Sequence, residues 1–265
     1  MLRRSCVALA TTAVVLAVLL VAARAVARAF VFPGRDVPAM ATPPDVTVHA
    51  LVARDGTPVR ALELPAAPGA RILVDFHNNR ETAESRVELA RALRALGFGV
   101  LLVEYRGYGA SRGASPSEDG LYLDAEAALD MLAGRGVEPD RIVLSGTSLG
   151  TGVAAEMARR GRGSGLVLVS PYTSIPDLVS DAAPFLPARA LVPDHFDTLA
   201  KSAAIQVPTL IIHGDSDEIV PFAMGERLAR AIPQARLVRV RGGHHGDLFA
   251  HEGERLLSEI ARLGS

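Results

Sequence analysis

Apolar positions along the chain form short uninterrupted runs that alternate with segments of helical periodicity. Five runs are each long enough for one buried strand: ARILVDF, FGVLLVEY, RIVLSG, GLVLVS and TLIIHG. Between them lie amphipathic segments that end at glycine, such as TAESRVELARALRALG, which stops at Gly97. Apolar strands that alternate with helices are typical of a mainly parallel sheet. The pattern therefore predicts an α/β fold with helices on both faces of that sheet.

Two stretches depart from this alternation. Before the first parallel strand, VTVHALVA and TPVRALELP predict two strands that are joined by a tight turn at Asp55–Gly56. Between Ser170 and Gln206, a proline-rich stretch interrupts the series and is too short to form a separate domain. We expect this stretch to form a small cap on the α/β domain.

The N-terminal segment has a different composition from the rest of the chain. Residues 5–23 are uncharged and rich in Ala, Val and Leu, and arginines flank them on both sides. A helix needs roughly 20 apolar residues to cross the hydrocarbon layer, so the length favours a single-pass anchor. A cleaved secretory signal remains open because Ala27–Arg28–Ala29 resembles a cleavage site, and a buried helix is the third alternative. Because both flanks are basic, charge does not predict the orientation.

These features divide the chain into an anchor or signal segment over residues 1–30, a proline-rich linker over 31–44 and one domain over 45–265. The net charge of −1 gives no basic surface for nucleic acid, so no nucleic-acid partner is expected. Cys6 is the only cysteine, which excludes an internal disulfide and a cysteine-based metal site.

A serine stands between two glycines where the predicted strand RIVLSG passes into a helix. In GTSLG, Gly146 and Gly150 lie two residues before and two residues after Ser148, which leaves room for a sharp turn. Such a turn lifts the hydroxyl clear of the sheet and puts it at a helix N-terminus, where the dipole favours developing negative charge. Because ligands bind beyond the carboxyl ends of parallel strands, Ser148 is a candidate nucleophile.

A serine hydroxyl becomes a good nucleophile when a histidine accepts its proton and a carboxylate orients that histidine. With this kind of turn, both partners are expected downstream, first the acid and then the histidine. Candidate acids follow TLIIHG at Asp215, Asp217 and Glu218, and candidate bases follow ARLVRVRG at His244 and His245. Each group falls at the carboxyl end of a predicted strand, so the three groups can converge.

These stretches resemble the alpha/beta hydrolases of the serine-aminopeptidase-like and BEM46-like group, which includes membrane-associated depalmitoylase-like serine hydrolases. The resemblance extends from about Ile72 to Phe249 and rests on VEYRGYGASRGASPSEDGLYLDAEAALDML, LSGTSLG, VSPYTSIPDL, HGDSDEIVPF and GGHHGDLF. It implies an alpha/beta-hydrolase fold with a small cap, and it makes residues 45–265 the catalytic domain. The motifs are specific for the group but only weakly specific for any one substrate.

The resemblance assigns a role to each candidate residue. The nucleophile falls on Ser148, and the family pattern H-G-x-x-D-x-x-V-P places the acid on Asp217. The closing pattern G-x-G-H-N-D-L-F places the base on His245. His244 stands where the family has glycine, and alignment on the glycines alone would select His244 instead, so both histidines stay candidates.

An oxyanion hole needs backbone N–H groups that point at the oxygen of the tetrahedral intermediate. One donor is the amide of Leu149, directly after the nucleophile. The resemblance implies that the other is Asn79, in the loop where the family reads H-G-N and this chain reads His77–Asn78–Asn79. Asn78 replaces a glycine, and because asparagine tolerates left-handed backbone angles we expect the turn to persist.

The sequence therefore predicts a serine hydrolase of the esterase or thioesterase type that needs no cofactor and no metal. Esters or thioesters of acyl chains are the first choice of substrate, and peptide bonds are the second. The alternatives are an acyltransferase with the same triad and a hydrolase-fold binding module without activity. The expected partners are a small-molecule or lipid-like acyl substrate and the membrane, unless signal cleavage releases the protein to a secreted or periplasmic location.

Overall fold

The computed structural model of the chain describes residues 2–38, 40–65 and 67–263. Met1, Ala39, Ala66, Gly264 and Ser265 belong to the predicted segments but lie outside the described residues, as does the side chain of Cys6.

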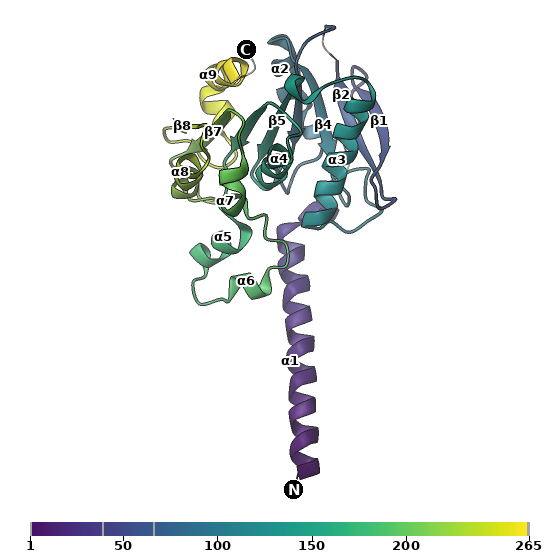
Figure 1. Ribbon diagram of the computed structural model, residues 1–265, viewed down its shortest axis with the longest axis vertical. Coiled ribbons are helices and arrows are strands. Elements are labelled where there is room, and N and C mark those ends of the chain that lie inside the picture. Colours follow the sequence, from purple (N-terminus) through teal and green to yellow (C-terminus); the bar gives the residue numbers. More distant parts are fainter. Residues whose placement is uncertain (1, 39, 66, 264–265) are drawn as a thin grey trace.

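One mixed sheet forms the centre of the domain (Figure 1). Its strands are β1 (Thr47–Val52), β2 (Pro58–Leu64), β3 (Ile72–Phe76), β4 (Gly99–Glu104), β5 (Ile142–Thr147), β6 (Gly165–Val169), β7 (Thr209–Gly214) and β8 (Ala235–Val240). They lie in the order β1-β2-β4-β3-β5-β6-β7-β8. The β1–β2 hairpin and the β2–β4 pair are antiparallel, and every pair from β4 to β8 is parallel. The predicted mainly parallel sheet is confirmed.

Helices cover both faces of this sheet. The α-helices are α1 (Leu2–Val31), α2 (Val87–Ala95), α3 (Glu118–Gly134), α4 (Leu149–Arg159), α5 (Ile175–Ala182), α6 (Ala188–Leu191), α7 (Thr198–Lys201), α8 (Phe222–Ala231) and α9 (Leu248–Leu263). Short 3₁₀ helices are η1 (Pro33–Asp36), η2 (Glu84–Arg86), η3 (Pro139–Arg141) and η4 (Ser202–Ala204). Helices α3, α4 and α8 pack on one face, whereas α2 and α9 pack on the other.

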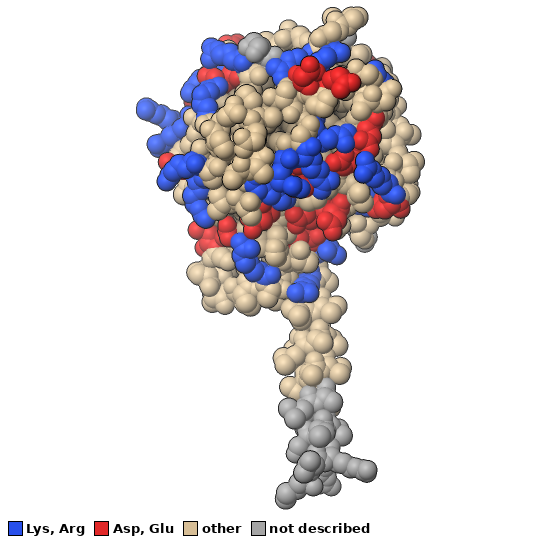
Figure 2. All heavy atoms as spheres, in the orientation of Figure 1, with Lys and Arg blue, Asp and Glu red and all other residues tan. Residues whose placement is uncertain are grey.

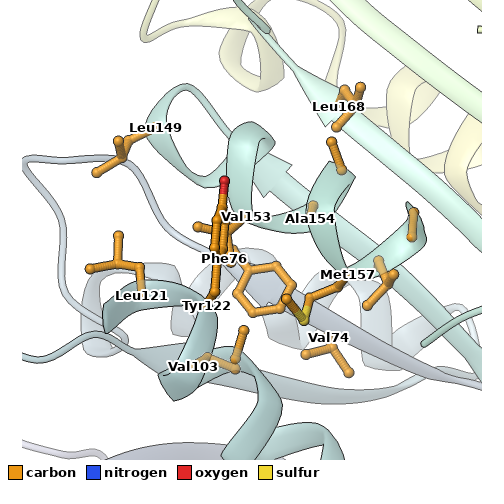
Figure 3. Close-up of a cluster of buried hydrophobic side chains, with 14 of the residues drawn as sticks. Val74, Phe76, Val103, Leu121, Tyr122, Leu149, Val153, Ala154, Met157 and Leu168 are labelled. Atoms are coloured by element: carbon orange, nitrogen blue, oxygen red, sulfur yellow. The ribbon is translucent and has the colours of Figure 1, made fainter. Parts of the chain in front are cut away.

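Alternate residues of the central strands feed these two cores. Val74 and Phe76 of β3 point to the core under α3 and α4, whereas Leu73 beside them points to the core under α2. All residues of β3, β4, β5, β6 and β7 are buried, which is why these strands read as apolar runs instead of alternating ones. Figure 3 shows how Val153, Ala154 and Met157 of α4 lie against Val74 and Phe76. This packing fixes α4, and with it the turn that precedes α4, on the sheet.

Helix α1 projects from the domain as a single long rod (Figure 1). The span from Thr11 to Val31 has 21 residues, the length and composition needed to cross a membrane, and only 6% of its hydrophobic window is buried. The described part of the helix that stands clear of the domain is uncharged (Figure 2). The alternative that this segment is a buried core helix is therefore wrong. Val31 and Phe32, at the start of the predicted linker, are buried in the domain.

The proline-rich stretch forms the small cap that the sequence predicts. It contains the three short helices α5, α6 and α7 between β6 and β7. Because α6 contacts α1 near the end from which the domain begins (Figure 1), the cap and the N-terminal helix share one side of the molecule.

Candidate active site

Four loops meet at the carboxyl edge of the parallel strands. They follow β3, β5, β7 and β8, and they contain the loop His77–Asn79, Ser148, Asp217 and His245 in turn. In an open α/β sheet this edge is where ligands bind. The fold therefore brings the residues that the sequence singled out to the same edge.

Ser148 occupies a strained turn between β5 and α4. Its backbone angles are φ 50° and ψ −116°, a region that residues with a side chain rarely adopt. The two glycines are needed because the chain passes too close for a side chain: a Cβ on Gly150 would lie 2.0 Å from the Phe76 carbonyl oxygen, and one on Gly146 would lie 2.2 Å from the Gly150 carbonyl oxygen. The Ser148 amide donates to the Val169 carbonyl at 2.9 Å, which holds the turn to the end of β6.

His245 lies between Ser148 and Asp217 and contacts both. Its Nε2 is 3.0 Å from Ser148 Oγ, and its Nδ1 is 3.0 Å from Asp217 Oδ1 and 2.9 Å from Oδ2. With Nδ1–H donating to the carboxylate, Nε2 carries a lone pair toward the serine hydroxyl. This is the arrangement in which a histidine can accept the serine proton.

The neighbouring candidates point elsewhere. The ring of His244 is more than half exposed, and its Nδ1 lies 3.1 Å from Glu218 Oε2. Asp215 accepts hydrogen bonds from the Gly242 amide at 2.7 Å and from Arg239 Nε at 2.8 Å, so it holds the loop after β8. Of the two histidines and the three acids, only His245 and Asp217 are directed at Ser148.

The side chain of Asp217 is fully buried, and several donors keep it ionised. The amides of Ile219 and Val220 donate to Oδ1 at 3.0 and 2.8 Å, and His213 Nε2 lies 3.3 Å from Oδ2. Burial alone would raise the pKa of Asp217, but hydrogen bonds from His213, His245 and Val220 outweigh burial and hold the pKa well below its ordinary value. Asp217 is thus a carboxylate at neutral pH and can stabilise a positive charge on His245.

The loop after β3 supplies the expected second oxyanion donor. The amide of Asn79 has no acceptor among the described residues, while its side-chain Nδ2 donates to the Val31 carbonyl at 3.1 Å. Leu149 is the first residue of α4, where backbone N–H groups have no partner within the helix. Both amides thus remain candidates for the oxyanion hole.

The turn at Asn78 persists as expected, but not through left-handed backbone angles. Among the described residues, only Ser148, Ser170 and Phe196 combine a side chain with positive φ, so Asn78 does not use left-handed angles. Its side-chain oxygen instead accepts the Arg80 amide at 2.8 Å, an Asx turn that closes the loop without a glycine.

His77 anchors this loop from below. Its Nδ1 donates to the Asn78 carbonyl at 2.7 Å, and its ring lies against Tyr105 and Tyr108 at centroid distances of 4.3 and 5.1 Å. Burial lowers the pKa of His77 to about 4, although the bond to Asn78 opposes this effect. His77 is therefore neutral at physiological pH and supports the loop.

A buried ionic network beneath the site was missed by the sequence analysis. Arg86 donates to Asp75 Oδ2 at 2.9 Å and to Thr147 Oγ1 at 3.0 Å, and Ser145 Oγ donates to Asp75 Oδ1 at 2.9 Å. Burial alone would lower the pKa of Arg86, but the charges of Asp75 and Glu81 outweigh burial and raise it. The network joins β3, β5 and the residue before Ser148. The signal available in the sequence was Asp75, the lone aspartate in the apolar run ARILVDF, because a charge in a buried strand needs a partner.

The side chains that could bind a metal are dispersed. Among the described residues, no three His, Cys, Asp or Glu side chains lie close enough together to hold a metal ion. The expectation that no cofactor is needed stays a prediction.

Two family models and several known proteins match this chain. A family model described as serine aminopeptidase, S33, matches residues 67–198, and one described as TAP-like protein matches residues 189–254. An uncharacterized protein of Mycobacterium tuberculosis is 42% identical over 197 residues, which cover 74% of this chain and 69% of that protein. The alpha/beta hydrolase domain-containing protein WAV2 of Arabidopsis thaliana is 33% identical over 227 residues, covering 77% of this chain and 73% of WAV2.

Solved structures of two esterases share the fold. The esterase RhEst1 from Rhodococcus superposes with a TM-score of 0.67 at 20% identity, over 82% of this chain and 98% of that chain. The Pyrococcus furiosus esterase Pf2001 has a TM-score of 0.68 at 19% identity, over 86% and 96% of the two chains. At this identity the likeness shows the fold alone.

The strained turn predicts an unusual order of stability. A Cβ makes positive φ costly, and Ala keeps the Cβ whereas Gly does not. The free energy of unfolding of Ser148→Gly should therefore be about 1 kcal/mol higher than that of Ser148→Ala. Thermal denaturation of the two purified variants measures the difference. The same two changes at Ser180, an exposed position in helix α5, should give the opposite sign, since glycine weakens a helix. A Gly variant less stable than the Ala variant at position 148 would contradict the strain.

Buried His77 predicts a pH-dependent loss of stability. Its pKa is about 4 in the folded chain, against about 6.5 when exposed, so the unfolded chain binds the proton first. The contribution of neutral His77 to the free energy of unfolding is complete above pH 6.5. It falls by up to about 3 kcal/mol as the pH drops to 4, and it is constant below pH 4. The unfolding free energy of His77→Gln should fall less over this window than that of the wild type. His251→Gln, at an exposed position, should retain the wild-type slope, and equal slopes for all three proteins would disprove the assignment.

Proposed function

The chain belongs to the alpha/beta hydrolases, and from that premise we propose that it cleaves a carboxylic ester or thioester with Ser148 as nucleophile, His245 as base and Asp217 as the acid of the triad. One observation carries the proposal: the two ring nitrogens of His245 lie within 3.0 Å of the Ser148 hydroxyl and of the Asp217 carboxylate. These residues come from three separate loops, and their order along the chain is that of an alpha/beta-hydrolase triad.

The geometry supports a two-step mechanism. His245 Nε2 takes the proton of Ser148 Oγ as this oxygen attacks the substrate carbonyl carbon, and Asp217 stabilises the resulting imidazolium. The amides of Leu149 and Asn79 donate to the oxyanion of the tetrahedral intermediate. On collapse of the intermediate, His245 returns the proton to the leaving alcohol or thiol, and the acyl group stays on Ser148. Water then attacks the acyl-enzyme and gives a proton to His245. The second tetrahedral intermediate collapses, the bond between the acyl carbon and Ser148 Oγ breaks, His245 returns the proton to Ser148 Oγ, and the carboxylic acid leaves.

The small cap and the apolar N-terminal helix support an acyl substrate. A cap of three short helices leaves Ser148 partly exposed, and the uncharged stretch of residues 5–23 in α1 supports attachment to a membrane. Acyl esters and thioesters are therefore preferred over peptide bonds. Acyl transfer to an alcohol or amine would use the same acyl-enzyme, with the acceptor in place of water.

We also propose that α1 is retained as a single-pass anchor. Its uncharged stretch, residues 5–23, is close to the roughly 20 residues that a helix needs to cross the hydrocarbon layer, and residues 11–22 of it are exposed. Release by signal cleavage is the alternative.

The proposed triad predicts which variants lose activity. A fluorophosphonate probe should label the wild type but not Ser148→Ala, and His245→Ala should lower kcat/KM on a short-chain ester at least about 1000-fold. His244→Ala is the matched control and should stay within a few-fold of the wild type, because its ring is directed away from Ser148. Loss of activity in His244→Ala alone would assign the base to His244. A folded wild type that is not labelled would favour a binding module.

The proposed anchor predicts where the protein is found in the cell. After cell fractionation, the full-length chain should remain in the membrane pellet at alkaline pH, with an intact mass near 27.9 kDa. Deletion of residues 2–23 should release the domain to the soluble fraction. Soluble protein at full mass would contradict the membrane proposal, and soluble protein of reduced mass would favour a cleaved signal.

A further inference from the structure

Outside α1, two adjacent large apolar side chains are exposed at the tip of the cap. Residues 183–187, which we call the cap tip, connect α5 to α6 and read Ala-Pro-Phe-Leu-Pro. Phe185 is 84% exposed and Leu186 is 38% exposed. The Phe185 side chain is more exposed than any other large apolar side chain among the described residues.

Direct contacts fix the cap tip relative to α1. Arg24 Nε donates to the Ala190 carbonyl of α6 at 3.0 Å, and Arg28 Nε donates to Asp194 Oδ2 at 2.8 Å. Arg24 is the first charged residue after the uncharged stretch of α1, so it marks the level at which a spanning helix leaves the hydrocarbon layer. Figure 1 shows the α5–α6 connection level with this part of α1, on the far side of α6. The cap tip therefore lies at the depth of the boundary between headgroups and acyl chains.

The candidate active site lies on the same side of the domain. The Val31 carbonyl at the end of α1 accepts the Asn79 side chain, and the ring of Phe32 lies 6.1 Å from that of Phe196 in the cap. Tyr172, at the start of the cap, donates to the Leu149 carbonyl at 3.2 Å. The end of α1, the cap and the oxyanion loop thus form one continuous contact.

We propose that the cap tip inserts into the bilayer that α1 spans, and that acyl chains of membrane lipids or lipid-modified molecules reach Ser148 beside it. This inference rests on the proposed membrane anchor and on the proposed serine hydrolase. The occupant of the exposed apolar surface is lipid. The contacts with α1 hold the cap tip where a bilayer would be, and prolines on both sides of Phe185–Leu186 limit the conformations that the cap tip must lose on insertion.

The chain contains no tryptophan, so a single introduced tryptophan reports its own environment. We would reconstitute full-length Phe185→Trp in vesicles of phosphatidylcholine and phosphatidylglycerol, with and without phosphatidylcholine brominated on its acyl chains. Leu16→Trp, in the exposed stretch of α1, is the positive control. Leu96→Trp is the negative control: Leu96 is 46% exposed and precedes β4, at the opposite edge of the parallel strands from the site.

Brominated lipid should quench the fluorescence of Phe185→Trp and of Leu16→Trp at least about twofold, because insertion places a side chain some 5–10 Å into the boundary region. The fluorescence of Leu96→Trp should be unchanged. Quenching in Leu16→Trp without quenching in Phe185→Trp would overturn the cap-tip proposal and leave the anchor intact. Blue-shifted but unquenched emission from Phe185→Trp would also overturn it, in favour of a protein or a second copy of the chain on this surface. Absence of quenching in Leu16→Trp would overturn the anchor and this inference together.

Activity measurements separate the cap tip from the hydrolase proposal. Phe185→Asp should lower hydrolysis of a long-chain ester in vesicles about tenfold relative to the wild type, since a charge opposes insertion. Its turnover of a water-soluble short-chain ester should stay within about twofold, because Phe185 is an exposed residue of the cap tip and not a member of the triad. Equal effects on both esters would contradict a role in membrane access. If the wild type hydrolyses neither ester, the hydrolase proposal fails whatever the quenching shows.

Discussion

The close approach of the turn at Ser148 to the end of β3 is the constraint on which the site depends. The Phe76 carbonyl leaves no room for a side chain at position 150, and Ser148 takes a backbone conformation that costs roughly 1–3 kcal/mol. That strain persists because β3, β5 and β6 are buried neighbours and the Ser148 amide is bonded to Val169. Packing of α4 on the sheet thus offsets the strain and presents the hydroxyl at the edge where the other loops converge.

Buried charge is the second feature that holds these loops in place. The ion pair between Asp75 and Arg86 lies under the turn, and Arg86 also binds Thr147, the residue before the serine. Removal of one partner from such a pair usually costs about 3–5 kcal/mol, so this network strongly couples the loop after β3 to the turn after β5. A network of this kind positions the site without contact with any substrate.

The N-terminal helix is part of the domain as well as a projection from it. Arg28, Val31 and Phe32 contact the cap and the oxyanion loop, so the last turn of α1 belongs structurally to the surroundings of the site. Because these contacts are made by polar and apolar groups together, they fix the direction of α1 relative to the cap. The position of the proposed bilayer relative to the site follows from this geometry.

The sequence by itself determined the architecture and the candidate residues. Apolar runs that alternate with helical segments predicted the parallel sheet, and the spacing of GTSLG predicted a turn with a serine at its tip, because both signals are local. Partnerships between distant segments were decided only by the tertiary structure. Adjacent residues of one loop can point in different directions, so the sequence left His244 and His245 open, whereas the structure directs His245 at Ser148 and His244 at Glu218. The loop at Asn78 is closed by a side-chain bond and not by left-handed angles, and Arg28 meets Asp194 across 166 residues. Periodicity contains no information about such pairs, since they depend on where the folded sheet places each loop.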